Sequence, residues 1–407
     1  MAATRSFITA LIRRAEGALT TRGAFLGVRG VTTSSDPQLQ RSTAEQLVNQ
    51  DIQVSEQQRR NEEAGQFTEL VRDFLNPKEF YDSIRAHNME FFCGVPDSLL
   101  KDFCAYVTEI TPRSNHVITV NEGQAIALAS GYHMATGKTA VVYLQANWEH
   151  LKNKSSCGIP FQVLPDYHEG AEQALYTARK HMETTKSPYC LLVRRQNFLP
   201  YKLQDEPEQY PLNREGVLQI IVDALHDKDV VVGTTGMLSR ELFEYRVTKG
   251  QGHEKDFLTV GSMGHASAIA LGIAKFRPRR QVFCLDGDGA ALMHMGNMAT
   301  IGHEQTKNLK HIIINNGCHD SVGGQPTVAG SDMFSFIDIA KASGYSVAMQ
   351  ASEPEDIAEK VKAMRSMDGP VLLEIKCNKG GRKDLGRPTR TPQQNKKDFM
   401  HFLAIDH

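Results

Sequence analysis

Two polar turns, separated by one helix-like and one strand-like segment, hold residues that could bind a metal ion. The run 281–285 leads into Asp288, which lies in a Gly-Asp-Gly turn, and the run 311–314 leads into Asn316. Neighbouring strands of a parallel sheet end at the same edge, so these turns would bring a carboxylate and an amide oxygen together. Mg2+ prefers such oxygen ligands. The alternative is two unrelated tight turns, in which Asp, Asn and Gly are common.

Further glycine-rich turns predict contacts with phosphate groups. Gly289 and Ala290 would open a helix, where backbone N–H groups and the helix dipole favour an anion. Two more such turns follow strand-like runs, and they contain Thr234, Thr235, Gly236, Ser262 and Met263. For Met263 the alternative is a core methionine, which is the commoner role of that residue type.

The first half of the chain offers two carboxylates after strand-like runs. Glu122 begins a predicted helix that Asn121 could cap and Gly137 could end. A glutamate at a helix start often does no more than interact favourably with the helix dipole. Asp97 lies in a turn, where the alternative role is to cap the turn and the following helix.

Parallel sheets are needed to position these turns. From Pro77 onward short apolar runs alternate with helical patterns, which predicts α/β domains because parallel strands need crossover helices. Strands are expected at 90–93, 117–120, 140–144, 160–164 and 189–193, and then at 230–232, 257–260, 281–285, 311–314, 345–348 and 371–375. The predicted domains cover 77–199 and 213–395, with a linker at 200–212 and a tail at 396–407.

The N-terminal 35 residues differ from the rest of the chain. They carry five arginines, no lysine and one acid, and apolar residues at 7, 8, 11 and 12 recur at helical spacing. This composition predicts an organellar transit peptide, with the mitochondrial matrix as the expected location. The alternatives are a disordered basic tail and a cytoplasmic protein. Residues 36–76 are rich in Gln, Glu and Arg, which predicts a polar linker.

The composition of the whole chain excludes several classes of protein. Its 407 residues carry a formal net charge of -1, so we expect no nucleic-acid partner. No apolar run reaches the roughly 18 residues of a membrane-spanning helix, so we expect no membrane partner. Seven scattered cysteines without a C-x-x-C pair predict reduced thiols of an intracellular protein and no zinc site.

The Gly-Asp-Gly turn, followed after 25 residues by Asn315-Asn316, resembles the cofactor motif of thiamine-diphosphate-dependent enzymes. The resemblance implies two tandem α/β domains, a pyrimidine-binding domain at 77–199 and a diphosphate-binding domain at 213–395. It implies thiamine diphosphate and Mg2+ as cofactors, with Asp288, Asn316 and the backbone carbonyl of Cys318 as metal ligands. The implied cofactor contacts are Thr234, Thr235, Gly236, Ser262, Met263, Gly287, Asp288, Gly289, Ala290 and Asn316.

The resemblance also implies roles for individual side chains. Met263 would be the apolar wedge that holds the two cofactor rings in their bent, reactive conformation. Glu122 would hydrogen-bond the pyrimidine ring and promote the tautomer that removes the C2 proton, while Asp97 would handle protons near the thiazolium. In this family the two halves of the site meet across a dimer interface, and small residues that recur along the Glu122 helix from Gly123 suit such a contact. A homodimer or dimer of dimers is therefore expected.

Several stretches resemble the phosphonopyruvate decarboxylase subgroup of this family, namely 94–100, 234–244, 315–327 and 383–389. The implied reaction is the loss of CO2 from a small 2-oxo acid, 3-phosphonopyruvate, to give phosphonoacetaldehyde. Lys383, Arg387 and Arg240 are candidate ligands of the phosphonate, with ordinary surface charge as their alternative. The competing functions are decarboxylation of sulfopyruvate and a cofactor-binding but inactive subunit.

One departure from the family pattern follows Gln145. The family continues with a loop, a helix, a strand and another loop, whereas here only 14 residues connect Gln145 to Pro160. A connection of that length is barely a single crossover. The first sheet is therefore expected to lack a strand and the substrate pocket to lack a loop. We expect either weak cofactor binding with slow turnover or a failure to fold.

Overall fold

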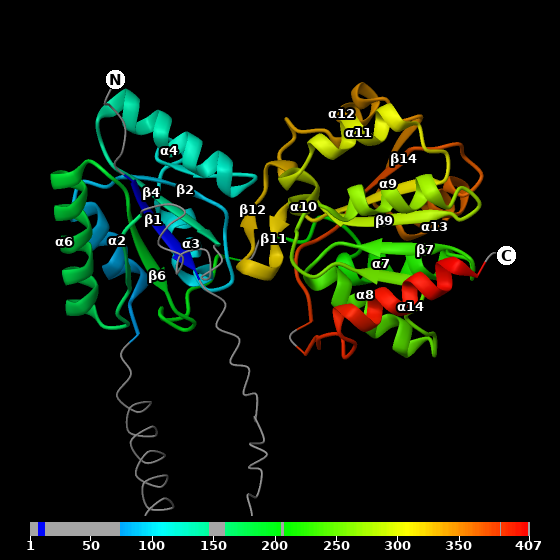
Figure 1. Ribbon diagram of the computed structural model, residues 1–407, viewed down its shortest axis with the longest axis horizontal. Helices are drawn as coiled ribbons and strands as arrows, with labels where there is room; N and C mark the ends of the chain where they lie inside the picture. Colours follow the sequence, from blue (N-terminus) through cyan, green and yellow to red (C-terminus); the bar gives the residue numbers. More distant parts are fainter. Residues whose placement is uncertain (1–6, 13–73, 146–158, 205–206, 383, 406–407) are drawn as a thin grey trace, which may run out of the picture.

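The computed structural model describes residues 7–12, 74–145, 159–204, 207–382 and 384–405. They form two α/β domains that lie side by side, each built on a six-stranded parallel sheet (Figure 1). The predicted fold of two tandem parallel-sheet domains is confirmed. Among the residues described, no helix has the length and apolar character needed to cross a membrane.

The first domain packs helices on both faces of its sheet. Its elements are β1 (Phe7–Ile12), α2 (Pro77–Ala86), β2 (Phe91–Gly94), α3 (Lys101–Ile110), β3 (His116–Ile118), α4 (Glu122–Thr136), β4 (Ala140–Gln145), β5 (Phe161–Val163), α6 (His168–Thr185) and β6 (Tyr189–Val193). The strands lie in the order β3-β2-β4-β1-β6-β5. The helices α2, α3 and α6 cover a core that includes Phe80, Phe103 and Leu175. On the other face α4 places Ala125 and Ala129 in a second core cluster with strand residues such as Val142.

The strand β1 comes from the predicted leader and lies inside the first sheet. It pairs in parallel with β4 on one side and with β6 on the other, so that Thr9 lies opposite both Val142 and Cys190. The sheet is therefore not one strand short, because this segment takes the position between β4 and β6. A short apolar run fits a buried parallel strand as well as a helix, which explains why the helical spacing at 7–12 was misleading.

The second domain has the same layered construction. Its elements are α7 (Arg214–Ala224), β7 (Val230–Gly233), α8 (Met237–Thr248), β8 (Asp256–Leu258), α9 (Ala266–Phe276), β9 (Val282–Gly287), α10 (Asp288–Met293), α11 (Gly296–Glu304), β10 (Leu309–Asn315), β11 (Cys318–His319), β12 (Gln325–Pro326), α12 (Phe336–Ser343), β13 (Val347–Ala351), α13 (Pro354–Met364), β14 (Val371–Lys376) and α14 (Pro392–Ala404). The large sheet has the order β13-β14-β10-β9-β7-β8. The helices α7, α8 and α13 cover one face, and α9, α11 and α12 cover the other. Each strand predicted from an apolar run is present, with some ends shifted along the chain.

The short antiparallel ribbon of β11 and β12 lies between the two domains (Figure 1). On this ribbon the Gln325 side chain donates from Nε2 to the carbonyl oxygen of Lys101 in the first domain, at 3.3 Å. The ribbon follows directly after Asn316, so the segment that leaves the end of β10 also contacts the neighbouring domain.

Hydrogen bonds connect the chain segments at the domain boundaries. Leu75 forms a β-bridge with Phe198, which joins the two ends of the first domain. The Asn378 side chain accepts hydrogen bonds from the backbone N–H groups of Gln209 and Tyr210, and so fastens the predicted linker 200–212 to the second domain. Residues 36–73 of the predicted polar linker and most of the predicted leader lie outside the described residues.

The predicted tail that begins at 396 falls inside the helix α14. Asn395 is buried and bonds the backbone of β8, donating to the carbonyl of Asp256 and accepting from the N–H of Leu258. Phe399 is also buried and packs beside Phe257. The second domain therefore continues through α14 instead of ending at 395, because this apolar helix face covers the edge strand.

Candidate active site

Asp288 lies where β9 passes into α10. The strands β9 and β10 pair in parallel with Gly287 opposite Ile314, so they end at the same edge of the sheet. Asp288 is 3% exposed, and its carboxylate accepts a hydrogen bond from the Thr327 hydroxyl. Burial raises the pKa of Asp288 to about 6, even though the bond from Thr327 opposes that shift. A carboxylate so far removed from water gains strongly from a bound cation.

Asn316 follows β10 at the same edge. Its Nδ2 donates to Oδ2 of Asp320 at 3.0 Å, and its Oδ1 accepts from the backbone N–H of Cys318 at 3.2 Å. Burial raises the pKa of the Cys318 thiol well above its ordinary value, so the thiol stays protonated. The backbone carbonyl, and not the sulfur, is therefore what Cys318 can offer to a hard cation.

The turn after β7 holds a buried hydroxyl that lacks a protein partner. Thr234 is 3% exposed, and its Oγ1 has no hydrogen-bond partner among the described residues. The backbone of Thr234 is satisfied, because its N–H donates to Leu285 and its carbonyl accepts from Ser239. Buried polar atoms are rarely left unsatisfied, so this hydroxyl indicates a ligand atom in the cavity that Thr234 lines.

The loop before α9 has an unusual backbone. Gly261, Ser262 and Gly264 have φ angles of 68°, 47° and 85°, in the left-handed region. A Cβ atom on Gly264 would lie 2.7 Å from the carbonyl oxygen of Ala290, so only glycine lets the loop pack against α10. A non-glycine residue with positive φ is uncommon and is held by its surroundings. The loop places Met263 on the cavity wall.

Glu122 begins α4, and the helix ends that the sequence predicts are confirmed. Asn121 caps the helix by accepting from the N–H of Gln124, and Gly137 ends it in the left-handed conformation at φ 70°. The side chain of Asn121 also donates to the carbonyl of Met293, at 3.5 Å. The start of α4 therefore faces the second domain of the same chain.

Asp97 lies between β2 and α3. Its Oδ1 accepts from the backbone N–H of Leu99 at 2.7 Å, so Asp97 caps the turn, whereas α3 has Leu100 at its N-cap and no side-chain cap. Asp97 is 4% exposed and also lines the cavity that Glu122 lines. Asp97 therefore stabilises the local turn and also lies at the candidate site.

A cavity of about 490 Å³ brings these residues together. The sequence-predicted residues that line it are Asp97, Glu122, Thr234, Thr235, Gly236, Ser262, Met263, Gly287, Asp288, Gly289, Ala290, Asn316 and Cys318. They come from both domains, and the volume is in the range of small-molecule and cofactor sites. The structure therefore gathers the residues predicted to bind the cofactor and the metal, and the two predicted acids, at one place.

Several lining residues were not singled out from the sequence. They are His265, His294, His319, Arg214 and Asp320. Burial lowers the pKa of His319 to about 4, which makes its ring neutral at pH 7. His265 directly follows the glycine loop, and His319 lies in the stretch 315–327. Their positions next to these motifs could have identified both as candidate site residues from the sequence. Nothing local shows that His294 and Arg214 face the same cavity.

Arg214 is paired inside the protein. Its guanidinium donates to the Glu241 carboxylate at 2.8 and 2.9 Å and to the Asp320 carboxylate at 2.7 Å. Since Asp320 also holds the Asn316 side chain, a chain of polar contacts leads from α8 to the candidate metal ligand. The predicted anion ligands Arg240 and Arg387 do not line the cavity, and Lys383 lies outside the described residues.

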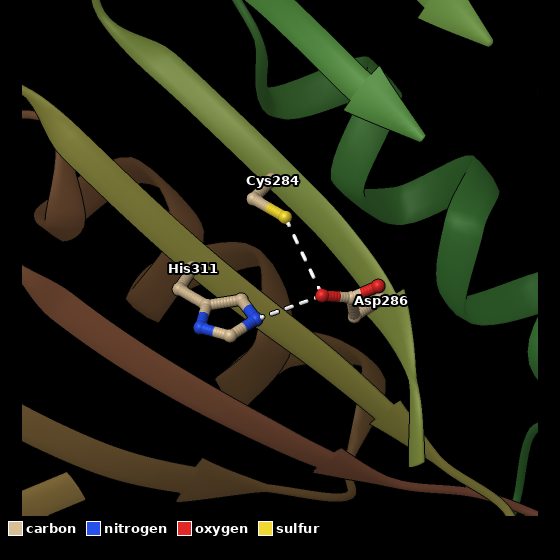
Figure 2. A group of neighbouring side chains, drawn as sticks. All are labelled: Cys284, Asp286 and His311. Carbon is tan, nitrogen blue, oxygen red and sulfur yellow. Dashed lines mark hydrogen bonds and ion pairs between the residues drawn. The ribbon is translucent and has the colours of Figure 1, made fainter. Parts of the chain in front are cut away.

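A separate polar cluster joins β9 to β10. Cys284 and Asp286 on β9 and His311 on β10 point toward one another (Figure 2). The Nε2 atom of His311 lies 3.2 Å from Oδ2 of Asp286, the Cys284 sulfur lies 3.6 Å from the same oxygen, and Nδ1 of His311 lies 3.0 Å from the Tyr345 hydroxyl.

These atoms are close enough together to surround a metal ion. However, Cys284 and His311 already have hydrogen-bond partners, and burial raises the pKa of Cys284 well above its ordinary value, which disfavours the thiolate that a metal would need. The cluster is therefore a hydrogen-bond network between strands. The six described cysteines are all free and buried, and Cys157 lies outside the described residues.

The cavity residues fit thiamine diphosphate with a divalent cation. The desolvated Asp288 carboxylate, Asn316 and the Cys318 carbonyl form an oxygen donor set of the kind that Mg2+ takes. The Thr234 hydroxyl has no partner among the described residues and is free to bind a ligand atom. A Cβ atom on Gly289 would lie 3.1 Å from the His319 ring, so glycine keeps the backbone open at the start of α10.

Comparison with known proteins places both domains in one family. Residues 78–151 match the N-terminal TPP binding domain of thiamine pyrophosphate enzymes, and residues 232–375 match the C-terminal TPP binding domain. The chain belongs to the thiamine pyrophosphate enzyme family.

Several relatives are decarboxylases of 2-oxo acids. The chain is 30% identical over 270 residues to a phosphonopyruvate decarboxylase of Streptomyces viridochromogenes, which covers 61% of this chain and 64% of that protein. It is 36% identical over 168 residues to sulfopyruvate decarboxylase subunit beta of Methanocaldococcus jannaschii, which covers 41% of this chain and 81% of that subunit. The solved structure of a thiamine diphosphate-dependent 4-hydroxybenzoylformate decarboxylase from Rhodococcus jostii aligns at 12% identity over 75% of this chain and 99% of that one, with a TM-score of 0.35.

Proposed function

We propose that this chain is a decarboxylase that requires thiamine diphosphate and Mg2+ and acts on 3-phosphonopyruvate, releasing CO2 and phosphonoacetaldehyde. The observation that carries the proposal is the position of Glu122, from the first domain, on the same cavity as Asp288 and Asn316 from the second. Similarity to phosphonopyruvate decarboxylases of two Streptomyces species supports the substrate, although the chain spans only 64% of the length of each.

The residues of the second domain would hold the cofactor. Asp288, Asn316 and the Cys318 carbonyl would bind Mg2+, and the backbone N–H groups at the start of α10 would face the diphosphate. Met263 would support the rings from the loop before α9. Thiamine diphosphate, when bound, supplies the nucleophilic carbon and accepts the electron pair released with CO2.

The two acids of the first domain would manage protons. Glu122 would hold the proton exchanged with the pyrimidine ring, and the start of α4 keeps its carboxylate on the cavity. Asp97 is nearly buried, with its Oδ1 anchored to Leu99, so it would present a fixed carboxyl group to the reacting end of the substrate. General acid–base catalysis by a placed group is worth about 10²- to 10⁴-fold in rate.

The test is a steady-state assay of the full chain with thiamine diphosphate and Mg2+, in which aldehyde formation from 3-phosphonopyruvate is measured. Glu122→Gln is expected to lower kcat by about 100-fold or more. Glu169→Gln is the matched control, since Glu169 also lies in the first turn of a first-domain helix but is exposed and does not line the cavity. The proposal fails if the unchanged chain forms no aldehyde, or if both variants behave alike.

Sulfopyruvate is the second candidate substrate. Sulfonate and phosphonate are similar tetrahedral anions, and the similarity to sulfopyruvate decarboxylase beta subunits of three methanogens favours this candidate. The ratio of kcat/KM for the two acids decides between them.

An inactive cofactor-binding subunit is the third candidate, and the short connection after Gln145 favours it because Gln145 lines the cavity. Binding of thiamine diphosphate without turnover of either acid would support this candidate.

We also propose a homodimer formed through α4 and a mitochondrial matrix location. Ile126 and Met134 are 46% and 68% exposed on α4, and a Cβ atom on Gly131 would meet no atom within 4 Å, so this apolar helix face is open to a second copy.

The arginine-rich leader supports the proposed mitochondrial location. Sedimentation of the purified chain tests the dimer, and import into isolated mitochondria tests the location.

A further inference from the structure

The cavity has few groups that can bind an anion. The described residues that line it include four carboxylates, no lysine and one arginine, Arg214. The guanidinium of Arg214 is already paired with Glu241 and Asp320. Apart from Arg214, the donors on the described wall that could meet a second anionic group are histidine rings, hydroxyl and amide side chains and backbone N–H groups. Of these, only the histidine rings can become cationic.

Two of the lining histidines form a stacked pair. The ring centroids of His265 and His294 are 4.0 Å apart, and the ring planes differ by 24°. His265 directly precedes α9 and His294 directly follows α10, so both rings are anchored at helix ends. Gly264 makes the pairing possible, because a Cβ atom there would lie 2.8 Å from Cδ2 of His294. The pair is thus built into the wall beside the loop that carries Met263.

The charge of this pair responds to its neighbours. Burial lowers the pKa of His294, and the nearby His265 lowers it further, whereas Glu122 raises it. Two imidazolium rings in this contact would repel each other, so the pair resists carrying two positive charges. An oxyanion at the ring edges would accept N–H hydrogen bonds and stabilise a positive charge on the pair.

The third histidine is less suited to this role. The ring of His319 is half-buried, and it packs against the backbone at Gly289, where a Cβ atom would lie 3.1 Å from it. It therefore belongs with the turn at the start of α10. His265 is exposed and His294 half-buried, which leaves both rings open to the cavity.

We infer that the stacked pair of His265 and His294 binds the tetrahedral oxyanion group of the substrate, a phosphonate or a sulfonate. This inference rests on the proposed decarboxylase function and names the residues that select its substrate class. It replaces the earlier candidates Arg240 and Arg387, neither of which lines the cavity.

The first test compares a substrate that has the second anionic group with one that lacks it. His265→Gln and His294→Gln keep a polar side chain but remove the imidazole ring. Each is expected to lower the ratio of kcat/KM for 3-phosphonopyruvate to kcat/KM for pyruvate by about 10-fold or more. His303→Gln, an exposed position on α11 away from the cavity, should leave the ratio unchanged. An unchanged ratio in both pair variants overturns the inference.

The second test does not depend on turnover. Binding of phosphonoacetate to the full chain, loaded with thiamine diphosphate and Mg2+, is measured by titration calorimetry. Both pair variants should bind it about 10-fold or more weakly than the unchanged chain and the His303→Gln control. If no acid is turned over but this weakening is seen, the decarboxylase function fails and the anion site stands. If the acids are turned over and binding is unaffected, the anion site fails.

A third measurement covers the case in which the variants do not fold. Histidines of the unchanged, loaded chain are modified with diethylpyrocarbonate and located by mass spectrometry, with and without phosphonoacetate. Protection of His265 by phosphonoacetate, with His303 modified equally in both samples, is the expected result. Equal modification of His265 in both samples overturns the inference.

Discussion

The imidazole of His311 on β10 bonds the carboxylate of Asp286 on β9, with Nε2 and Oδ2 3.2 Å apart (Figure 2). Tyr345 extends this contact, because its hydroxyl lies 3.0 Å from the other ring nitrogen of His311. Asp288 and Asn316, the proposed metal ligands, directly follow these two strands. The buried network joins the strands just upstream of the site, and we expect His311 to be a positioning residue.

Replacing His311 by alanine should weaken both the fold and the metal site. The change leaves the buried Asp286 carboxylate without its imidazole partner, which costs about 1–3 kcal/mol of unfolding free energy. Urea unfolding measures that loss, and a Mg2+ titration of the thermal shift caused by thiamine diphosphate measures the site. His303→Ala is the exposed control. A loss of stability with unchanged Mg2+ dependence would show that the network is structural only.

The raised pKa of Asp288 predicts that cofactor binding depends on pH. Its pKa is raised by burial from 3.8 to about 6, so the folded protein binds this proton more tightly than the unfolded chain does. The contribution of Asp288 to stability therefore falls as pH rises from about 4 to 6, and a bound cation offsets this loss.

The increase in Tm caused by Mg2+ and thiamine diphosphate should accordingly be larger at about pH 7.5 than at about pH 5. Differential scanning fluorimetry at both pH values measures it. In Asp288→Asn the increase should be small at both values. An increase in the unchanged chain that does not vary with pH would contradict the assigned role of Asp288.

Loss of the N-terminal segment should destabilise the first domain. Without residues 1–35 the chain lacks β1, and β4 and β6 lose the backbone hydrogen bonds of a central strand, each worth about 1 kcal/mol. Thermal unfolding and limited proteolysis of the first domain measure the effect. A chain that lacks only residues 1–6 is the control, because it keeps β1. Equal stability of all three chains would contradict the pairing of β1.

The same experiment bears on the proposed leader. Removal of a transit peptide at the end of residues 1–35 would also remove β1 from the sheet. If mitochondria import the chain, sequencing of the N-terminus of the imported protein will show whether residues 7–12 are retained. Retention is expected if β1 is required for the folded first domain.

A substitution on the open face of α4 should disrupt the proposed dimer without disrupting the fold of the single chain. A Cβ atom at position 131 meets no neighbouring atom within 4 Å in the single chain, and Gly131→Phe improves helix propensity, so folding should be preserved. A second copy could no longer approach closely, and the dimer should dissociate in sedimentation velocity. Thr184→Phe, on the exposed end of α6, is the control and should leave the assembly unchanged. An unaltered dimer in Gly131→Phe would exclude this face as the interface.

Much of the fold could be predicted because the relevant signals are local. Strands such as Tyr189–Val193 are apolar runs bounded by polar residues, and the caps at Asn121 and Gly137 depend on residues within one helical turn. The strand at 7–12 was assigned wrongly, because a six-residue apolar run does not distinguish helix from strand. Its conformation depends on the space between β4 and β6, which are distant in the sequence.

By itself, the sequence determined the two α/β domains and the turns that carry Asp288, Asn316 and Glu122. Turn residues and strand order place Asp288 and Asn316 at one edge of the second sheet, and Glu122 shortly after a strand of the first. Only the tertiary structure decided which groups share the cavity. It paired His265 with His294 and neutralised Arg214 with Glu241 and Asp320. Those contacts join segments far apart in the chain, and their geometry depends on how helices and sheets pack, which no local pattern of residues encodes.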